Sequence, residues 1–336
     1  MNTQLPANTD ISRSLPQSGI AAFRLIDSEL VQVKRLIDKQ LAAGPDNSEI
    51  ARLLPTVSTG KMLRPGLVLL AGAACGKITD KHIRVAAIVE IIHNATLLHD
   101  DVIDEGQKRR GQPTVNALCG NESAVLLGDF LLSKAFRMCA DLDPHIIKII
   151  AAAAARTCEG EMRQIAQRRN CRLSESEYID IITQKSASLF TCCCHLGGLL
   201  AGAGRTQVRL LADFGRYTGI AFQITDDLLD ITGSENKTGK TLGSDVDKNK
   251  LTLPVIHLLR AVDESEKSTV KSIVNTAGQS KKALAELLTS HGSLEYAHSR
   301  AQEFVAKAIA ALADFKESSA KEALIETAKF IERRAI

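Results

Sequence analysis

The chain has 336 residues, of which 45% are hydrophobic, so it is long enough to build one large core or two ordinary ones. Its net charge of +3 is too small to indicate a nucleic-acid partner. Aromatic residues make up only 4% and Trp is absent, whereas Ala and Leu abound. This composition favours closely packed helices over a β-sandwich.

The cysteines and the apolar runs indicate a soluble, cytoplasmic protein. Eight cysteines show no paired spacing, and the contiguous Cys192-Cys193-Cys194-His195 run lacks the loop that a zinc knuckle needs. We expect reduced, mostly buried thiols. The longest apolar run, 146–155, is too short to span a bilayer and contains Lys148. No signal peptide or transmembrane segment is predicted.

Helical patterns follow one another along most of the chain. Residues 1–18 are polar, and we expect a disordered leader there, followed by one domain over 19–336. An amphipathic pattern from Ile20 stops at Gly44-Pro45. Further helices are predicted at 65–75, 82–104, 124–140, 146–169, 174–189 and 208–230, with a polar loop at 231–250 and shorter helices after Pro254. With no strand pattern and no repeat, the chain is predicted to be all-α, with ten or more helices.

Two clusters of aspartates end two of the long apolar patterns. The first is Asp100-Asp101-Val102-Ile103-Asp104, and the second is Asp226-Asp227-Leu228-Leu229-Asp230. A spacing of four places Asp100 and Asp104 on one helical face. Two carboxylates that close repel by roughly 1 kcal/mol in water and by about 4 kcal/mol at an effective dielectric near 20. Oxygen-only ligands suit Mg²⁺, so we expect divalent ions between the clusters.

Basic residues accompany both clusters. Arg109 and Arg110 follow the first cluster, and Lys240 and Lys250 follow the second. Further basic residues stand at a predicted helix start and inside a mostly apolar helix, namely Lys61, Arg64 and Lys185. Arg binds phosphate in a bidentate manner and Lys acts as a point charge. Carboxylates for metal and cations for phosphate predict a site that holds two phosphorylated groups.

These stretches together resemble the trans-isoprenyl diphosphate synthases, also called the polyprenyl synthetase family. The resemblance runs from about residue 25 to the C-terminus and is carried by residues 60–65, 93–104, 109–114, 128–130, 185–187, 219–230 and 239–240. It implies helices around a central cavity, the isoprenoid synthase type of fold, usually as a homodimer. It also implies a transferase that condenses isopentenyl diphosphate head-to-tail with an allylic diphosphate, releasing diphosphate and building a trans-polyprenyl diphosphate.

The resemblance also implies a role for each motif residue. Asp100, Asp104 and Asp226 would be the direct ligands of about three Mg²⁺ ions, and with Lys185 they would form the catalytic set. Asp101, Asp227 and Asp230 would support them, partly through water. The allylic diphosphate would be bound by Arg109, Lys185, Gln223 and Lys240. Isopentenyl diphosphate would be bound by Lys61, Arg64, His93 and Arg110, with Lys250 a further candidate near the same mouth.

Product length is expected to depend on the residues just before the first cluster. Family members that stop at short products tend to carry a bulky aromatic residue there. Ala95 and Thr96 occupy these positions and predict an open tunnel and a medium-to-long product. Two alternatives stay open: a short product, geranylgeranyl or farnesyl diphosphate, and a simple packing role for Ala95 and Thr96.

The chain departs from the usual family pattern at four positions. Thr59 replaces a Gly, Met62 replaces a basic residue, Ser186 replaces a Thr, and Asn249 replaces a Gly. None of these changes removes a charged group that the chemistry needs.

Other interpretations of the same residues also exist. Glu90-x-x-His93 and Glu295-x-x-His298 are typical of a di-iron carboxylate bundle, an oxidoreductase alternative. A class I terpene cyclase shares the ionisation step, but its second metal motif is usually of an Asn/Ser/Glu type. A non-catalytic subunit of a heteromeric synthase typically loses one cluster. His93 is alternatively a core histidine, Lys185 a surface lysine, and Arg333-Arg334 a solvated helix end.

Overall fold

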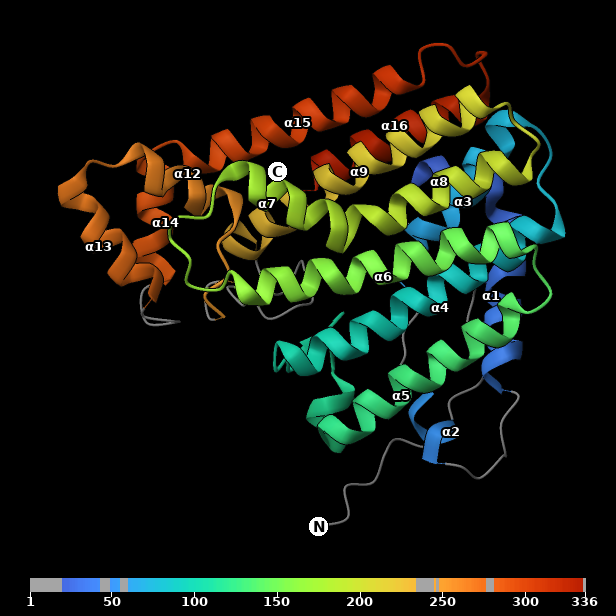
Figure 1. Ribbon diagram of the computed structural model, residues 1–336, viewed down its shortest axis with the longest axis horizontal. Coiled ribbons are helices and arrows are strands. Elements are labelled where there is room, and N and C mark those ends of the chain that lie inside the picture. The colour runs from blue at the N-terminus through green and yellow to red at the C-terminus, as the bar shows by residue number, and fades with distance from the viewer. Residues whose placement is uncertain are drawn as a thin grey trace.

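Helices make up nearly all of the regular structure in the computed structural model, which describes residues 20–42, 49–54, 60–233, 245, 248–275 and 281–334 (Figure 1). After the 3₁₀ turn η1 (Ala21–Ile26), the α-helices are α1 (Asp27–Ala42), α2 (Glu49–Leu53), α3 (Leu63–Cys75), α4 (Asp80–Ile103), α5 (Val115–Cys139), α6 (Pro144–Ala166), α7 (Glu175–Ile182), α8 (Ser188–Leu200), α9 (Arg205–Thr232), α12 (Leu253–Ala261), α13 (Glu264–Asn275), α14 (Lys281–Ser290), α15 (Ser293–Ala311) and α16 (Ser319–Arg333). The predicted all-α fold of ten or more helices is confirmed. The expected leader at 1–18 lies outside the described residues.

Five helices form the centre of the core. α8 packs against α3 and α9, and α4 packs against α3 and α5. The middle of α4, Val85–Val89, is fully buried, as its apolar pattern on most sides predicts. The cysteine run Cys192–Cys194 is buried within α8, and its three thiols are free.

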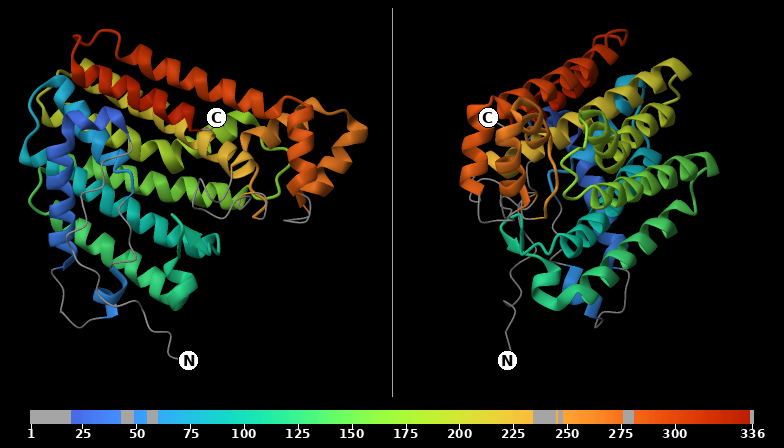
Figure 2. Two further views of the ribbon diagram at one scale, coloured as in Figure 1. Left: turned by 180° about the vertical axis from the view of Figure 1, so that it is seen from behind. Right: turned by 60° about the vertical axis from the view of Figure 1, so that its left-hand side comes forward.

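The two helices that carry the aspartate clusters run in the same direction. In Figure 1 both α4 and α9 pass from right to left, and the reverse view in Figure 2 shows the same relation. α15 lies along α9, and α16 packs against both α3 and α9. The C-terminal ends of α4 and α9 therefore lie on the same side of the molecule.

The helix predicted over 174–189 is longer than its pattern indicated. A π-helical turn, η3 (Thr183–Ala187), joins α7 to α8, and α8 continues to Leu200. Near the end of α8, Gly197 allows close packing on α3, because a Cβ there would stand only 2.4 Å from the carbonyl oxygen of Val68. Tertiary packing here outweighs the low helix propensity of glycine.

In the part of the chain that the structure describes, no helix has both the length and the apolar character needed to cross a bilayer.

Candidate active site

One short segment after α9 touches both aspartate clusters. The Lys250 Nζ atom lies 2.7 Å from Asp104 Oδ2, in the first cluster, and 3.7 Å from Asp245 Oδ1. The backbone N–H of Asp245 donates a hydrogen bond to Asp230 Oδ2, in the second cluster, at 3.1 Å. The structure therefore brings the two clusters together at the common end of α4 and α9.

In the first cluster, Asp100 is the residue whose carboxylate is most disfavoured by its surroundings. Burial raises the pKa of its carboxyl group from 3.8 to about 6, with Glu161 and Asp104 adding to the rise and Lys185 opposing it. A carboxylate in this position is disfavoured by desolvation and by its acidic neighbours. A cation placed beside Asp100 would relieve both effects.

Lys185 is held by two side chains of α6. Its Nζ atom lies 2.5 Å from Glu161 Oε2 and donates a hydrogen bond to Gln164 Oε1 at 2.8 Å. Burial opposes the charge of Lys185, but Glu161 and Asp100 raise its pKa above the ordinary lysine value. The surface-lysine alternative is therefore wrong. Sequence reasoning missed Glu161 and Gln164, although Glu159-Gly160-Glu161 stands out as an acidic pair around a glycine inside a helix.

The π-helical turn that carries Lys185 is packed directly against α6. A Cβ on Gly160 would stand 2.2 Å from the Lys185 backbone nitrogen, so only glycine permits this approach. π turns in α-helices often occur at functional sites, because they reorient the side chains that follow. Here the turn places Lys185 beside Glu161 and within the electrostatic reach of Asp100.

The paired arginines lie on a small hairpin that the sequence did not predict. Strands β1 (Lys108–Arg109) and β2 (Gln112–Pro113) pair antiparallel. The two residues between them, Arg110 and Gly111, have φ angles of 53° and 76°, the conformation of a type I′ turn. The hairpin escaped detection because each strand is only two residues long and is largely exposed.

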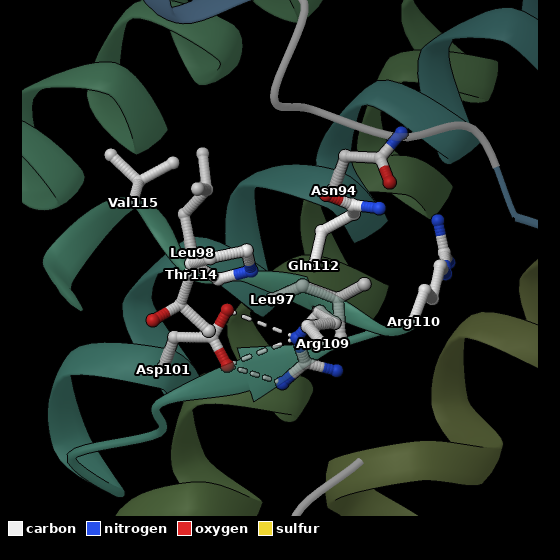
Figure 3. Close-up of a pocket in the computed structure, with 10 residues that line it drawn as sticks. Asn94, Leu97, Leu98, Asp101, Arg109, Arg110, Gln112, Thr114 and Val115 are labelled. Carbon is white, nitrogen blue, oxygen red and sulfur yellow. Dashed lines mark hydrogen bonds and ion pairs between the residues drawn. The ribbon is translucent and has the colours of Figure 1, made fainter. Parts of the chain in front are cut away.

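Arg109 is bound to the middle aspartate of the first cluster. Its Nε lies 3.0 Å from each carboxylate oxygen of Asp101, and its Nη2 lies 2.7 Å from Oδ1 (Figure 3). Asp101 is 6% exposed. The pair borders a pocket lined by Asn94, Leu97, Leu98, Asp101, Arg109, Arg110, Gln112, Pro113, Thr114 and Val115. Asp101 thus orients Arg109.

Arg110 points toward the start of α3. Its guanidinium packs on Gly60, where a Cβ would stand 2.3 Å from Nη2. Arg64 of α3 lies over the Phe190 ring, 4.9 Å from the centroid. Desolvation lowers the pKa of both arginines, and the buried carboxyl group of Glu90 raises it. Burial in turn raises the pKa of Glu90, which the two arginines lower. Glu90 therefore serves as a shared counter-ion for Arg64 and Arg110.

The end of α16 reaches the second cluster. Arg334 Nη2 lies 3.2 Å from Asp226 Oδ1, and its guanidinium lies 5.1 Å from the centroid of Phe222. The interpretation of Arg333-Arg334 as a solvated helix end was therefore wrong for Arg334. Lys61 is nearby, because its Nζ lies 5.3 Å from the ring centroid of Phe330, also in α16.

Asp227 is the buried member of the second cluster. It accepts hydrogen bonds from Tyr178 Oη at 2.6 Å and from Gln223 Nε2 at 2.7 Å. Gln223 Oε1 accepts a hydrogen bond from the hydroxyl of Ser186. Burial, with a contribution from Asp245, raises the pKa of Asp227 to about 8. Both ends of the Gln223 amide are thus bound within the protein.

The remaining predicted residues are placed as follows. His93 is partly buried in α4, two turns before Asp100 and on the same helical face. Ala95 is fully buried, whereas Thr96 is partly buried and donates a hydrogen bond to the His93 carbonyl at 2.8 Å. Lys240 lies outside the described residues. Asn249 has a φ of 53°, a left-handed conformation that glycine and asparagine adopt more readily than other residues.

The donor set fits a hard divalent ion. The aspartate carboxylates supply only oxygen atoms, which Mg²⁺ prefers. Among the described residues, no three His, Cys, Asp or Glu side chains are grouped closely enough to hold an ion. Basic groups take that place, because Lys250 and Arg168 (Nη2 to Asp104 Oδ1, 3.3 Å) pair with Asp104, and Arg334 pairs with Asp226.

A family model described as Polyprenyl synthetase matches residues 49–290. The chain belongs to this family. The octaprenyl diphosphate synthase of Haemophilus influenzae is 38% identical over 273 residues, which are 80% of this chain and 83% of that protein. A short chain isoprenyl diphosphate synthase of Methanothermobacter thermautotrophicus is 35% identical over 82% of this chain and 86% of its own length. A polyprenyl synthase of Caulobacter crescentus, solved with calcium and isoprenyl diphosphate, superposes with a TM-score of 0.88 at 33% identity, covering 93% of this chain and 96% of that one.

Membership of the polyprenyl synthetase family confirms the assignment made from the motifs, and with it a prenyltransferase that builds polyprenyl diphosphates. The di-iron alternative is wrong. Glu90 is 2% exposed and serves the two arginines, whereas Glu295 is exposed on α15. The two Glu-x-x-His patterns therefore do not share an interior site.

Replacing Asp100 by asparagine should stabilise the metal-free protein at pH 8. The folded-state pKa is raised, so the ionised carboxylate costs stability above about pH 6, and this cost is lost as the pH falls toward the unfolded value near 4. We expect Asp100→Asn to raise the free energy of unfolding by on the order of 2–3 kcal/mol at pH 8, and the gain to shrink between pH 6 and 4. Urea unfolding across this pH range, with EDTA present, measures the effect. A loss of stability at pH 8 would contradict it.

Proposed function

We propose that this polyprenyl synthetase condenses isopentenyl diphosphate head-to-tail with an allylic diphosphate in an Mg²⁺-dependent reaction. The observation that supports it is the junction of the two aspartate clusters through Lys250 and Asp245. Members of both clusters meet there, and the basic groups Lys250, Arg168 and Arg334 pair with Asp104 and Asp226. Acidic and basic groups in this arrangement suit diphosphates and the metal ions that accompany them.

Asp100, Asp104 and Asp226 are the proposed Mg²⁺ ligands. Bound at these carboxylates, the ions would supply positive charge to the departing diphosphate oxygens. Calcium in the related Caulobacter structure supports a divalent ion. On metal binding, Lys250 and Arg334 would exchange their aspartate partners for phosphate oxygens. Asp230 would support these ligands, and the anchored Asp101 and Asp227 would hold the neighbouring side chains.

The allylic diphosphate is proposed to lie against Lys185 and Arg109, with Lys240 from the loop after α9. Lys185 stays positively charged, because Glu161 and Asp100 raise its pKa. Arg109 keeps its orientation through Asp101 and still has guanidinium N–H groups for phosphate. Gln223 is proposed to contribute to the binding of the allylic diphosphate. These cations stabilise the charge that develops as the allylic C–O bond ionises.

Isopentenyl diphosphate is proposed to bind Lys61, Arg64, Arg110 and His93. The buried carboxyl group of Glu90 acts electrostatically on both Arg64 and Arg110 and opposes the lowering of their pKa by desolvation. This arrangement holds the double bond of the second substrate near the allylic cation, so that bond formation becomes effectively intramolecular. The proton lost after the attack is proposed to go to the released diphosphate, because no motif residue is left for the role of general base.

A medium-to-long product is proposed. The octaprenyl relative supports it, and the short chain relative represents the alternative. Ala95 has no exposed surface and lies just over one turn before Asp100 in α4. A small residue at this point leaves room for a growing chain, whereas a ring would fill it.

A homodimer is also proposed. Large apolar side chains are strongly exposed on α5 and α6: Leu126 is 68% exposed, Phe136 67% and Met162 71%. Large apolar side chains exposed to this degree favour an interaction surface on these helices. A second copy of the chain is the partner that would cover these helices.

Chain extension should require the metal and both clusters. Purified protein is incubated with Mg²⁺, labelled isopentenyl diphosphate and each allylic primer in turn, and the extracted products are sized. We expect extension with at least one primer, its loss with EDTA, and a decrease in kcat of at least about a hundredfold in Asp100→Ala and Asp226→Ala. Asp141→Ala, at an exposed surface ion pair, is the control and should keep full activity. If no primer leads to diphosphate release, the proposed condensation reaction is refuted.

A bulky residue at position 95 should shorten the product. Ala95→Phe places a ring beside the first cluster, and Ala95→Leu makes a smaller intrusion, so product length should fall in that order. Chromatography of the products measures the length, and thermal unfolding shows that each variant is folded. Full-length product from folded Ala95→Phe would remove Ala95 from the tunnel wall.

A charge on the exposed apolar surface should separate the proposed dimer. Sedimentation at micromolar concentration should give a dimer for the wild type and a monomer for the double variant Leu126→Glu, Phe136→Glu. Leu25→Glu makes the same chemical change in η1, where Leu25 is 48% exposed, and should leave the dimer intact. A monomeric wild type, or a dimeric double variant, would refute this interface.

A further inference from the structure

We propose that Tyr178 is a positioning residue of this active site. Its hydroxyl fixes Asp227 and, through Gln223 and Ser186, the π-helical turn that presents Lys185. The inference rests on the proposed function of Lys185 as a ligand of the allylic diphosphate, and it assigns a role to a tyrosine that the motifs do not include.

The connection is a continuous series of hydrogen bonds from α7 to η3 by way of α9. Tyr178 Oη donates to Asp227 Oδ2 at 2.6 Å, and Gln223 Nε2 donates to Asp227 Oδ1 at 2.7 Å. The Ser186 hydroxyl donates to Gln223 Oε1. Tyr178 is 1% exposed and Asp227 3%, so the bond between them is shielded from water, whereas Gln223 is partly exposed.

The direction of the donors makes Asp227 the end point of the series. Both of its oxygens accept from neutral groups, whereas Asp101 is paired with Arg109, Asp104 with Lys250, and Asp226 with Arg334. These two bonds occupy both oxygens of Asp227. Asp227 would have to break two such bonds to turn toward a metal ion. It therefore acts as an anchor for Gln223, and Tyr178 holds the anchor.

The turn that receives this series has little freedom elsewhere. On one side Gly160 of α6 lies against the Lys185 backbone, and on the other Gly219 of α9 lies against Ala187, where a Cβ would stand 2.6 Å from the Ala187 Cα. The backbone is thus held between two helices, and the Ser186–Gln223 bond ties it to α9 by side chains. Ser186 supplies the hydroxyl that this bond needs.

Tyr178 is expected to affect the binding of only one of the two substrates. Lys185 belongs to the allylic side, whereas Arg64 and Arg110 are set by α3, the hairpin and Glu90, none of which depends on Tyr178. Loss of the Tyr178 hydroxyl should therefore weaken allylic diphosphate binding and leave isopentenyl diphosphate binding unchanged. A merely structural tyrosine would lower stability without this selectivity.

The test compares Tyr178→Phe with Tyr296→Phe. Tyr296 Oη also donates to a carboxylate at 2.6 Å, that of Glu175, but lies outside the active site on α15. For Tyr178→Phe we expect a rise of about tenfold in the allylic KM, with the KM for isopentenyl diphosphate changed by less than about twofold. Ser186→Ala should shift the same KM, and Ser186→Thr should restore it. Calorimetric binding of a non-hydrolysable allylic thiolodiphosphate with Mg²⁺ should show the same order of affinities.

Several results would overturn the proposal. Equal allylic KM values for Tyr178→Phe and Tyr296→Phe, or a parallel rise in both KM values, would show that Tyr178 only stabilises the fold. If Tyr178→Phe does not fold, Ser186→Ala decides by the same measurements. A wild type that binds the analogue and turns over, beside an unaffected Tyr178→Phe, refutes the positioning role alone. A wild type that neither binds the analogue nor turns over refutes the proposed function, and the positioning role with it.

Discussion

Repulsion among the carboxylates at the ends of α4 and α9 is the constraint on which the rest of the site depends. Two parallel helices end at one side of the molecule, and each brings three aspartates with it. A different basic residue forms an ion pair with each of three aspartates: Arg109 with Asp101, Lys250 with Asp104, and Arg334 with Asp226. The carboxylate of Asp100 remains disfavoured, because burial raises its pKa to about 6.

The same constraint explains the nature of the basic groups around the site. Those that cover Asp104 and Asp226 come from the chain after α9 and from the end of α16, segments that join the site from its rim. In the proposed reaction, metal ions would take their place at the aspartates, and these basic groups would then be available to bind phosphate oxygens. By contrast, Arg109 and Lys185 are each held by a buried carboxylate, that of Asp101 or of Glu161, which fixes their orientation.

Small residues and unusual backbone conformations position these charged groups. Gly160 lets the π-helical turn approach α6 closely, and this contact places Lys185 beside Glu161. The left-handed conformation of Arg110 turns the hairpin so that neighbouring arginines serve different parts of the site. Each of these features is local, but it positions a charged group only because another part of the structure is packed against it. The site is therefore a property of helix packing as much as of the motifs.

The sequence by itself determined the all-α fold, the family and the two aspartate clusters, because helical periodicity and charged motifs at fixed spacing are local signals. It did not identify Glu161, Tyr178, Glu90 or Arg334 as parts of the site, since each acts on a partner that is distant along the chain. The hairpin and the continuation of α8 past Gly197 also went undetected, because strand pairing and close packing on Val68 outweigh local propensity. Only the tertiary structure decided which charge faces which, because that depends on how the helices cross and not on the order of their residues.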